Sequence, residues 1–473
     1  MVFSSTIFLL YFLPVFLLVY FLSPEKLKNY ILLAASLIFY AWGAPVFIFI
    51  LVGSTIITFY LIRVMHDAST EKRKKAFLVL AIFMNTGILL YFKYANFFME
   101  NFNSILQSFG AESVGWTSIA LPIGISFYTF QSLSYCVDVY RGVSQPLKRP
   151  TDFLLYISMF PQLIAGPIVR FNTISEQITS RESKGSDRIL GFYRFTIGLA
   201  KKVLIANVMG KHADLIMAMD PDAISSSQAW VGLLAYSFQI YFDFAGYSDM
   251  AIGIGRMLGF RFPENFNNPY VSKSITEFWR RWHMTLSAWM RDYLYIPLGG
   301  NRVKTKSRLF FNLWVVFLIS GLWHGASWNF VIWGGYHGLF LVLDRLFLKK
   351  LLDRIGALPA TVFTFFIAIL GWVVFRIESF PDAMTFYGRL FAFDFDPLQL
   401  VEKRDLLIIM PIAALFSFIT LTSVGRKLET KVFFSDYTKR RYIIMGITAA
   451  ILFLLSVGVT MASGFNPFIY FRF

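Results

Sequence analysis

The chain has 473 residues, of which 56% are hydrophobic, 19% are aromatic and only 15% are charged. Its mean hydropathy of +0.59 excludes a soluble globular protein, because too few polar side chains remain to cover an apolar core. The formal net charge of +16 is carried by Lys and Arg that cluster in short segments between apolar runs. That pattern orients membrane helices, and no basic domain is large enough to bind nucleic acid.

Apolar runs long enough to cross a bilayer recur from one end of the chain to the other. They predict an all-α, polytopic membrane protein in which residues 1–473 form a single membrane domain with about eleven or twelve spanning helices. The expected segments are roughly 5–22, 29–42, 45–62, 76–92, 118–138, 189–208, 228–258, 308–322, 325–347, 359–375, 405–423 and 441–462.

The charges in the loops predict how these helices are oriented. The loops Arg63–Lys75 and Arg426–Arg441 are rich in Lys and Arg and are expected on the cytoplasmic side. The loop Lys211–Gln228 carries three aspartates and fits the outer side. The first apolar run has no basic segment before it and no cleavage site after it, so we expect a retained helix rather than a signal peptide.

Two segments depart from the pattern of simple spanning helices. Residues 153–169 contain Pro161 and Pro167, which interrupt the helical hydrogen-bond ladder, so a broken or re-entrant helix buried in protein is expected. The run 189–208 carries Arg194, Lys201 and Lys202. Arg194 and Lys201 are seven residues apart and share one helical face, which favours an amphipathic helix at the cytoplasmic surface over a true span.

The apolar run 228–258 contains two carboxylates, Asp243 and Asp249. They lie six residues apart and therefore about 240° apart around a helix, so they cannot form one catalytic dyad there. Each is open to two interpretations, a functional role or a structural partnership with a buried arginine or hydroxyl. The spacing Gly255-x-x-x-Gly259 in the same run is typical of close helix packing.

The sequence SITEFWRRWHMTLSAWMRDYLY begins at Ser274, which forms a capping box with Glu277 and predicts the start of an amphipathic helix. On one continuous helix, Arg280 and Arg281 face away from the apolar sector. His283 lies at the edge of that sector and turns inward. It is a candidate catalytic residue, although interfacial histidines also place their rings at the membrane surface without any chemical role.

A second motif with a candidate histidine is the run SGLWHGASWNFVIWGGYHGL, in which His324 interrupts an apolar and aromatic segment at membrane depth. A charged residue there costs about 2.5 kcal/mol or more, so such residues usually line a cavity or perform chemistry. A neutral imidazole is suited to act as a general base on a hydroxyl. Gly321 and Gly325 allow a substrate or a neighbouring helix to approach, while Trp323 and Trp328 are placed to exclude water. The structural alternative is a buried imidazole bonded to a carbonyl.

The remaining histidines and the single cysteine have simpler interpretations. His337 follows His324 by thirteen residues and falls on a different helical face, which favours packing. His66 and His212 lie next to charged residues and are expected at a solvated surface. Cys136 has no second thiol to pair with and is expected to pack in the interior. No motif for a metal, a nucleotide or a serine nucleophile is present, so no bound metal or cofactor is expected.

These motifs resemble those of the membrane-bound O-acyltransferase family, and most closely its alginate O-acetyltransferase-like bacterial branch. The resemblance is carried by DFAGYSDMAIGIGRMLGFRFPENFNNPY from Asp243, the two histidine motifs above and the ending NPFIYFRF from Asn466. It implies a ring of tilted helices around a thinned centre, where a funnel from each side meets at the family's histidine. That histidine matches His324, and the second family histidine matches His283.

The resemblance also implies a reaction and its participants. A cytoplasmic thioester such as acetyl-CoA would donate an acyl group across a bacterial inner membrane to a hydroxyl, for O-acetylation of an alginate-like or peptidoglycan-like polysaccharide. A periplasmic SGNH-type, esterase-like protein is the expected partner. The expected substrate-binding residues are Trp323, Asn329, Asp249, Arg280 and Arg281. The two arginines suit an anionic donor or anionic lipid headgroups equally well. The alternatives are a teichoic-acid type D-alanyl transferase and a polysaccharide or lipid transporter.

Overall fold

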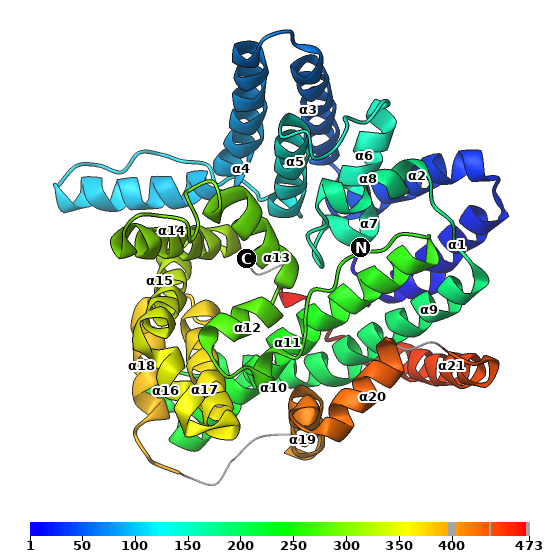
Figure 1. Ribbon diagram of the computed structural model, residues 1–473. Helices are drawn as coiled ribbons and strands as arrows, with labels where there is room; N and C mark the ends of the chain where they lie inside the picture. The colour runs from blue at the N-terminus through cyan, green and yellow to red at the C-terminus, as the bar shows by residue number, and fades with distance from the viewer. Residues whose placement is uncertain (396–402, 435–436, 470–473) are drawn as a thin grey trace.

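The computed structural model describes residues 1–395, 403–434 and 437–469, and within them every regular element is helical. The all-α class is therefore confirmed. Figure 1 shows a broad ring of helices, with α11, α12 and α13 near its centre.

The first part of the chain comprises α1 (Leu13–Leu22), α2 (Glu25–Gly43), α3 (Ile48–Asp67), α4 (Glu71–Ser108), α5 (Ile125–Tyr140), α6 (Pro150–Ser158), α7 (Phe160–Leu163), α8 (Phe171–Thr179), α9 (Gly185–Ala200), α10 (Asn207–Met217) and α11 (Ser226–Met257). The second part comprises α12 (Ile275–Arg281), α13 (Met284–Met290), α14 (Lys306–His324), α15 (Trp328–Leu343), α16 (Lys349–Ile355), α17 (Ala357–Arg376), α18 (Phe380–Leu390), α19 (Lys403–Phe418), α20 (Ser423–Phe433) and α21 (Lys439–Ala462). Short π-helical turns are η1 (Phe8–Phe12), η2 (Lys201–Ala206), η5 (Arg291–Tyr295) and η6 (Asp344–Leu348), and the 3-10 turns are η3 (Pro221–Ala223), η4 (Pro269–Val271) and η7 (Ile419–Leu421).

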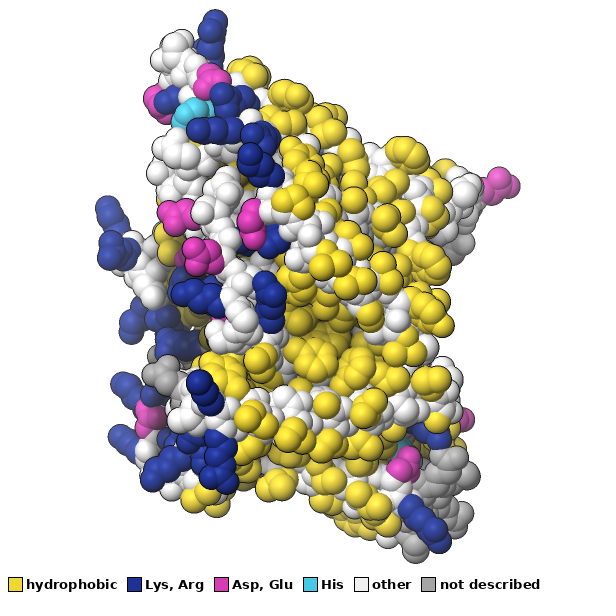
Figure 2. All heavy atoms as spheres, turned by 90° about the vertical axis from the view of Figure 1, so that its right-hand side faces the viewer, with side chains coloured by type: hydrophobic (Ala, Val, Ile, Leu, Met, Phe, Trp, Pro, Cys, Tyr) yellow, Lys and Arg dark blue, Asp and Glu magenta, His cyan; other side chains and the backbone are white. Residues whose placement is uncertain are grey.

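Six helical stretches in the described residues are long and apolar enough to cross a membrane. They are α3, α4, α15 together with α16, α17, α19 and α21, and each corresponds to one of the predicted segments. The other predicted segments form shorter helices, such as Phe8–Leu22, or more polar interior helices, such as α11. Figure 2 shows a wide band of hydrophobic side chains with Lys and Arg gathered along one edge, as expected for a multi-pass membrane protein.

Helix α11 is the buried axis of the molecule, and α9 packs along it in backbone contact. Its first turn is fixed by a capping box, in which the side chain of Ser225 accepts from the backbone N–H of Gln228. A Cβ atom on Gly198 of α9 would lie only 2.5 Å from the carbonyl oxygen of Gly246. A Cβ atom on Gly253 would lie 2.6 Å from an α9 carbonyl. Small residues at this interface therefore let the two helices approach closely.

Gly255 and Gly259 both pack closely, but against non-helical residues rather than against another helix, since a Cβ atom on Gly259 would lie 2.8 Å from the carbonyl oxygen of Glu182. Gly255 does pack closely, because a Cβ atom there would lie 2.6 Å from the ring of Phe262. Gly259, however, lies beyond the last residue of α11 and has a φ of +88°. It therefore ends the helix, since a left-handed residue after the last turn is a typical helix stop.

The segment 189–208 is not among the helices that are long and apolar enough to span, as expected, but its basic side chains do not form an open surface stripe. Helix α9 and the turn η2 are packed against α11, and their basic residues face its carboxylates. Arg194 and Lys201 lie 2.6 Å and 2.7 Å from the two oxygens of Asp249, which confirms their shared face. Lys202 lies 2.9 Å from Asp243, and both side chains are almost fully buried. The two aspartates therefore form separate ion pairs, as the structural interpretation predicts.

The chain is broken between α6 and α8, as the two prolines predict. Helix α6 ends at Ser158, the four-residue α7 follows, and residues 164–170 are not helical although they are almost entirely buried. Side chains from other elements satisfy part of this backbone. The N–H of Phe160 donates to Oγ of Ser36 at 3.1 Å, and the N–H of Ile168 donates to Oγ1 of Thr285 at 2.9 Å. Such partners replace water in a membrane interior.

The last described residues turn back into the centre of the molecule. The ring of Phe468 stacks on Tyr247 of α11 at 4.8 Å, and the backbone N–H of Ile469 donates to Oδ2 of Asp243 at 2.9 Å. The hydroxyl of Ser4 donates to Oδ1 of Asn466 at 2.9 Å. The beginning, the middle and the end of the described chain therefore meet next to one ion pair.

Candidate functional site

Helix α14 ends at His324, and α15 begins four residues later, so the histidine occupies a tight turn between two antiparallel neighbours. A Cβ atom on Gly321 would lie 2.2 Å from the carbonyl oxygen of Phe330, and one on Gly325 would lie 2.0 Å from its ring. Both glycines therefore allow α15 to approach α14. Of the two expected reasons for these glycines, a nearby substrate or a neighbouring helix, the structure supports the neighbouring helix.

The imidazole of His324 lies in an aromatic environment. The rings of Trp323, Trp333 and Phe375 lie 5.0 Å, 5.1 Å and 5.3 Å from its centroid. Within the described residues, the hydrogen bond that His324 forms involves its backbone carbonyl and not its ring nitrogens, unlike the carbonyl-bonded imidazole of the structural alternative. The predicted water-excluding role of Trp328 is wrong, because that side chain is 59% exposed and donates to Asn101.

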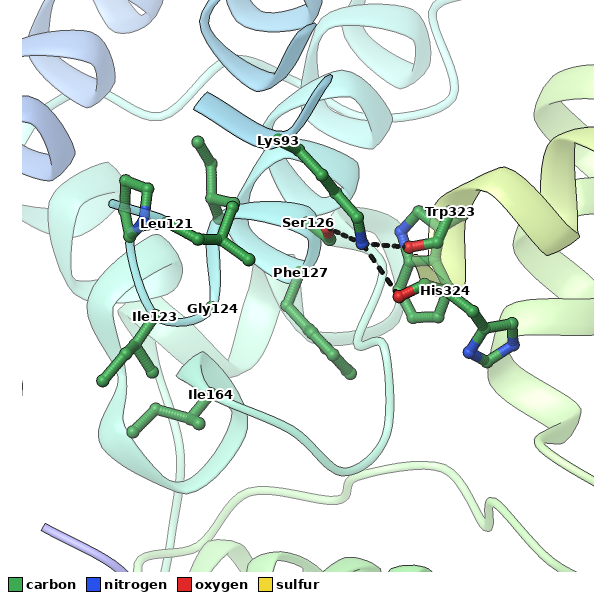
Figure 3. Close-up of a pocket in the computed structure, with 11 residues that line it drawn as sticks. Lys93, Leu121, Ile123, Gly124, Ser126, Phe127, Ile164, Trp323 and His324 are labelled. Carbon is green, nitrogen blue, oxygen red and sulfur yellow. Dashed lines mark hydrogen bonds between the residues drawn. The ribbon is translucent and has the colours of Figure 1, made fainter. Parts of the chain in front are cut away.

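Two cavities border His324. The larger has a volume of about 150 Å³, and its lining includes Lys93, Ser126 and Trp323 (Figure 3). The smaller has a volume of about 10 Å³ and is lined by Ile240, Phe244, Trp282, His324, Trp333, Trp372, Phe375 and Ile469. His324 belongs to both linings: its backbone carbonyl faces Lys93 at the larger cavity, and its ring lies among Trp333 and Phe375 at the smaller one.

The predicted continuous helix from Ser274 is interrupted at the second candidate histidine. Ser274 caps α12 as expected, by accepting from the N–H of Glu277. Helix α12 ends at Arg281, Trp282 is extended, and His283 adopts a left-handed conformation with a φ of +43° before α13 begins. Such a conformation is uncommon for a residue other than glycine and needs tertiary support.

Asn265 provides that support and fixes the tautomer of His283. Its Nδ2 donates to the carbonyl of Gly166 at 3.3 Å and to Oγ of Ser248 at 3.0 Å, so its Oδ1 is the acceptor. This oxygen lies 3.0 Å from Nδ1 of His283 and also accepts from Oγ1 of Thr285 at 2.7 Å. Nδ1 therefore carries the proton. Nε2 is left as an acceptor, and it is buried without a hydrogen-bond partner in the described residues.

The fold brings the two histidines together. The ring of Trp323 lies 5.0 Å from that of His324 and 6.0 Å from that of His283. Phe244, which lies 4.7 Å from the ring of His283, also lines the small cavity with His324. The predicted pair thus forms one buried site, built from the end of α14 and the break between α12 and α13. Trp323 also lines the larger cavity.

The other candidate residues are placed less directly. Nδ2 of Asn329 donates to the carbonyls of Ile377 and Glu378 at 2.5 Å and 2.9 Å, so this side chain secures the end of α17. Asp249 is engaged by its two basic partners on α9 and η2. Arg280 is exposed, and Arg281 pairs with Glu277 on its own helix at 2.8 Å. None of these four borders either cavity at His324.

The remaining histidines and the single cysteine lie outside the candidate site, and two of these histidines, His337 and His212, are buried. His337 is fully buried and surrounded by aromatic rings, among them Trp279 and Trp333 at 5.0 Å each, which agrees with a packing role. His66 is exposed, as predicted. The prediction for His212 is wrong, because this side chain is fully buried and its Nε2 lies 3.0 Å from Oδ1 of Asp405. The buried, unpaired thiol of Cys136 agrees with packing.

Sequence reasoning missed Lys93 and Asn265. Lys93 follows the predicted span 76–92 by one residue, and a lysine on a spanning helix is itself a signal of function. It is 91% buried, with an exposed fraction of 9%, and contacts the end of α14. Asn265 lies in a polar segment after α11, and no spacing within that segment indicates a histidine partner eighteen residues later.

The fold and this site define a multi-pass membrane protein with a buried histidine pair. Residues 147–378 match the model of the membrane-bound O-acyltransferase family. A "Probable alginate O-acetylase" of Azotobacter vinelandii is 43% identical over 90% of this chain and 85% of its own length. A peptidoglycan O-acetyltransferase of Helicobacter pylori is 39% identical over 81% of this chain and 78% of its own. A teichoic acid D-alanyltransferase of Bacillus subtilis is 30% identical over 54% of this chain and 69% of its own.

The chain belongs to the membrane-bound O-acyltransferase family, and it is an O-acyltransferase. This membership argues against the alternative function as a polysaccharide or lipid transporter.

Proposed function

We propose that this enzyme transfers an acetyl group from a cytoplasmic thioester, such as acetyl-CoA, to a hydroxyl on the far side of a bacterial inner membrane, for O-acetylation of an extracytoplasmic polysaccharide. The observation that carries the proposal is the ring of His324, which borders the small internal cavity and forms no hydrogen bond with the described residues. The relatives named for O-acetylation of alginate and of peptidoglycan cover most of the chain and support the acceptor class.

In the proposed reaction His324 is the general base. It takes the proton of the acceptor hydroxyl while the oxygen attacks the thioester carbonyl. The resulting tetrahedral adduct expels the thiolate, which receives the proton from the imidazolium, so the products are the ester and a free thiol. His283 orients the acceptor, because its unprotonated Nε2 can accept a hydrogen bond within the same site.

The small cavity supports acetyl rather than a larger acyl group. Its volume of about 10 Å³ corresponds to roughly one water-sized or methyl-sized group. Its lining is aliphatic and aromatic, apart from His324 itself. A D-alanyl group adds an amino group and a methyl group to the acetyl skeleton, and this cavity offers the amine no carboxylate. The alginate and peptidoglycan relatives also match more of the chain than the D-alanyltransferases do.

The partners in this proposal follow from where the acyl group emerges. A periplasmic SGNH-type, esterase-like protein would accept it and modify the polysaccharide. Arg280 and Arg281 lie at the end of α12, outside both cavities, where they suit an anionic donor or lipid headgroups.

The thioester assignment is tested with the purified protein in vesicles and acetyl-CoA carrying label on the acetyl group. We expect one free thiol to appear for each labelled ester that forms on a hydroxyl acceptor. Thiol is measured with a chromogenic disulfide, and ester by retained label. Transport of intact donor into the vesicles without thiol release would contradict the proposed function.

The size of the small cavity is tested by replacing Ile240, which lines it, with alanine. We expect Ile240→Ala to raise the ratio of propionyl to acetyl transfer about tenfold, since one methylene in an apolar pocket is worth roughly 1–3 kcal/mol of discrimination. Ile216→Ala is the matched control, because that isoleucine is also buried and lines neither cavity. Equal ratios in the two variants would show that this cavity does not select the acyl group.

A further inference from the structure

The carbonyl end of α14 lies inside the protein and needs hydrogen-bond donors. The last four carbonyls of a helix have no partner within the helix, and a membrane interior offers no water to replace one. In α14 these carbonyls belong to residues 321–324. The carbonyl of Gly321 accepts from the N–H of Gly325 at 3.3 Å, which leaves the carbonyls of Leu322, Trp323 and His324.

Two consecutive residues of α4 satisfy all three of these carbonyls. The hydroxyl of Tyr94 donates to the carbonyl of Leu322 at 2.6 Å. Nζ of Lys93 donates to the carbonyl of Trp323 and, at 3.1 Å, to that of His324. Figure 3 shows both lysine contacts reaching the backbone from across the larger cavity. A neighbouring helix thus caps the end of α14.

The surroundings of Lys93 suit an ammonium group, because they supply one acceptor oxygen for each of its three N–H donors and a partial negative charge. Its third donor reaches Oγ of Ser126 at 3.4 Å, so three oxygens surround three N–H groups. Among the described residues, Lys93 forms no ion pair with a carboxylate. The negative end of the α14 dipole takes the place of a counter-ion, as it does for cations at other helix C-termini.

Lys93 does not reach the reacting atoms. Figure 3 shows the imidazole of His324 pointing away from Lys93, on the other side of the backbone that the lysine holds. We propose that Lys93, together with Tyr94, is a positioning residue that fixes the imidazole of His324 by capping α14 from α4. The inference rests on the proposed role of His324 as the base. A displacement of about 1 Å at a catalytic group can cost a hundredfold in rate, so a cap at this residue controls turnover.

The first test separates turnover from binding. Lys93→Met keeps most of the unbranched stem, one atom shorter, and removes its donors, so we expect kcat to fall about tenfold to a hundredfold while KM for the thioester changes less than about twofold. Tyr94→Phe removes one donor and is expected to reduce kcat less. Tyr91→Phe is the control, because Tyr91 lies on the same helix and is 54% exposed. An unchanged kcat in Lys93→Met would overturn the proposal.

Chemical rescue distinguishes the ammonium from simple packing. The variant Lys93→Cys is made together with Cys136→Ala, which removes the other thiol. Reaction with 2-bromoethylamine rebuilds an ammonium group at nearly the length of lysine, and we expect it to restore most of kcat. Reaction with a neutral alkyl reagent of the same length is expected to restore none. Equal recovery with both reagents would reduce the role of Lys93 to filling space.

A readout without substrate keeps this inference separate from the proposed function. Loss of the cap frees the end of α14, so hydrogen exchange at amides 320–328 is expected to be faster in Lys93→Met than in the wild type or in Tyr91→Phe. Unchanged exchange would overturn the cap itself. Faster exchange combined with full activity of a His324→Ala variant would retain the cap and refute the catalytic role of His324.

Discussion

Replacing His324 with alanine is expected to abolish acyl transfer while the amount of protein in the membrane stays normal. A positioned general base contributes about 10²- to 10⁴-fold to the rate, and no other histidine in the described residues lines either cavity. The measurement is ester formation with labelled acetyl thioester, normalised to the abundance of the variant. KM for the donor should change little, because the lost interaction is made in the transition state.

The control for this experiment is His337→Ala. This histidine is also buried among aromatic rings, but it lines neither cavity. We therefore expect His337→Ala to lower the unfolding temperature without a comparable loss of kcat. Full activity in His324→Ala, once abundance is accounted for, would remove this residue from the proposed chemistry.

The second large effect is expected at the ion pair between η2 and α11. Lys202→Met leaves the carboxylate of Asp243 buried without its cation, and breaking such a pair costs about 3–5 kcal/mol. Thermal unfolding in detergent should show a marked loss of stability. The double variant Lys202→Met with Asp243→Leu removes both charges and should regain most of that loss, since an apolar replacement of a buried pair is often neutral.

An exposed ion pair provides the comparison for this result. Arg63 and Asp67 lie 3.4 Å apart on α3, with 45% and 60% of their side chains exposed. Because solvent screens such a pair, Arg63→Met is expected to cost less than about 1 kcal/mol. If Lys202→Met is as stable as Arg63→Met, the buried pair contributes no more than a surface one.

The sequence predicts best where one segment determines the outcome. The apolar runs predict the spanning helices, the two prolines predict the break after α6, and Ser274 predicts the start of α12. In each case the signal is a local periodicity, cap or helix breaker, and the surrounding structure does not override it. The two candidate histidines lie near the same tryptophan, Trp323, which neither motif predicts by itself.

The sequence predicts poorly where the partner is distant. Periodicity continues through His283, yet the helix breaks there because Asn265 and Thr285 hold a conformation that the local pattern opposes. The basic residues of α9 and η2 resemble a surface stripe until the carboxylates of α11 are placed opposite them. His212 looks solvated until Asp405 is brought to its ring from almost two hundred positions away.

The meeting of Ser4, Asp243 and residues 466–469 has a consequence for how this protein is assembled. Segments separated by more than two hundred positions must come together before the carboxylate on α11 receives its backbone donor. Because Lys202 neutralises this carboxylate from the neighbouring turn η2, only its backbone donor depends on the last described residues, and such distant contacts form slowly.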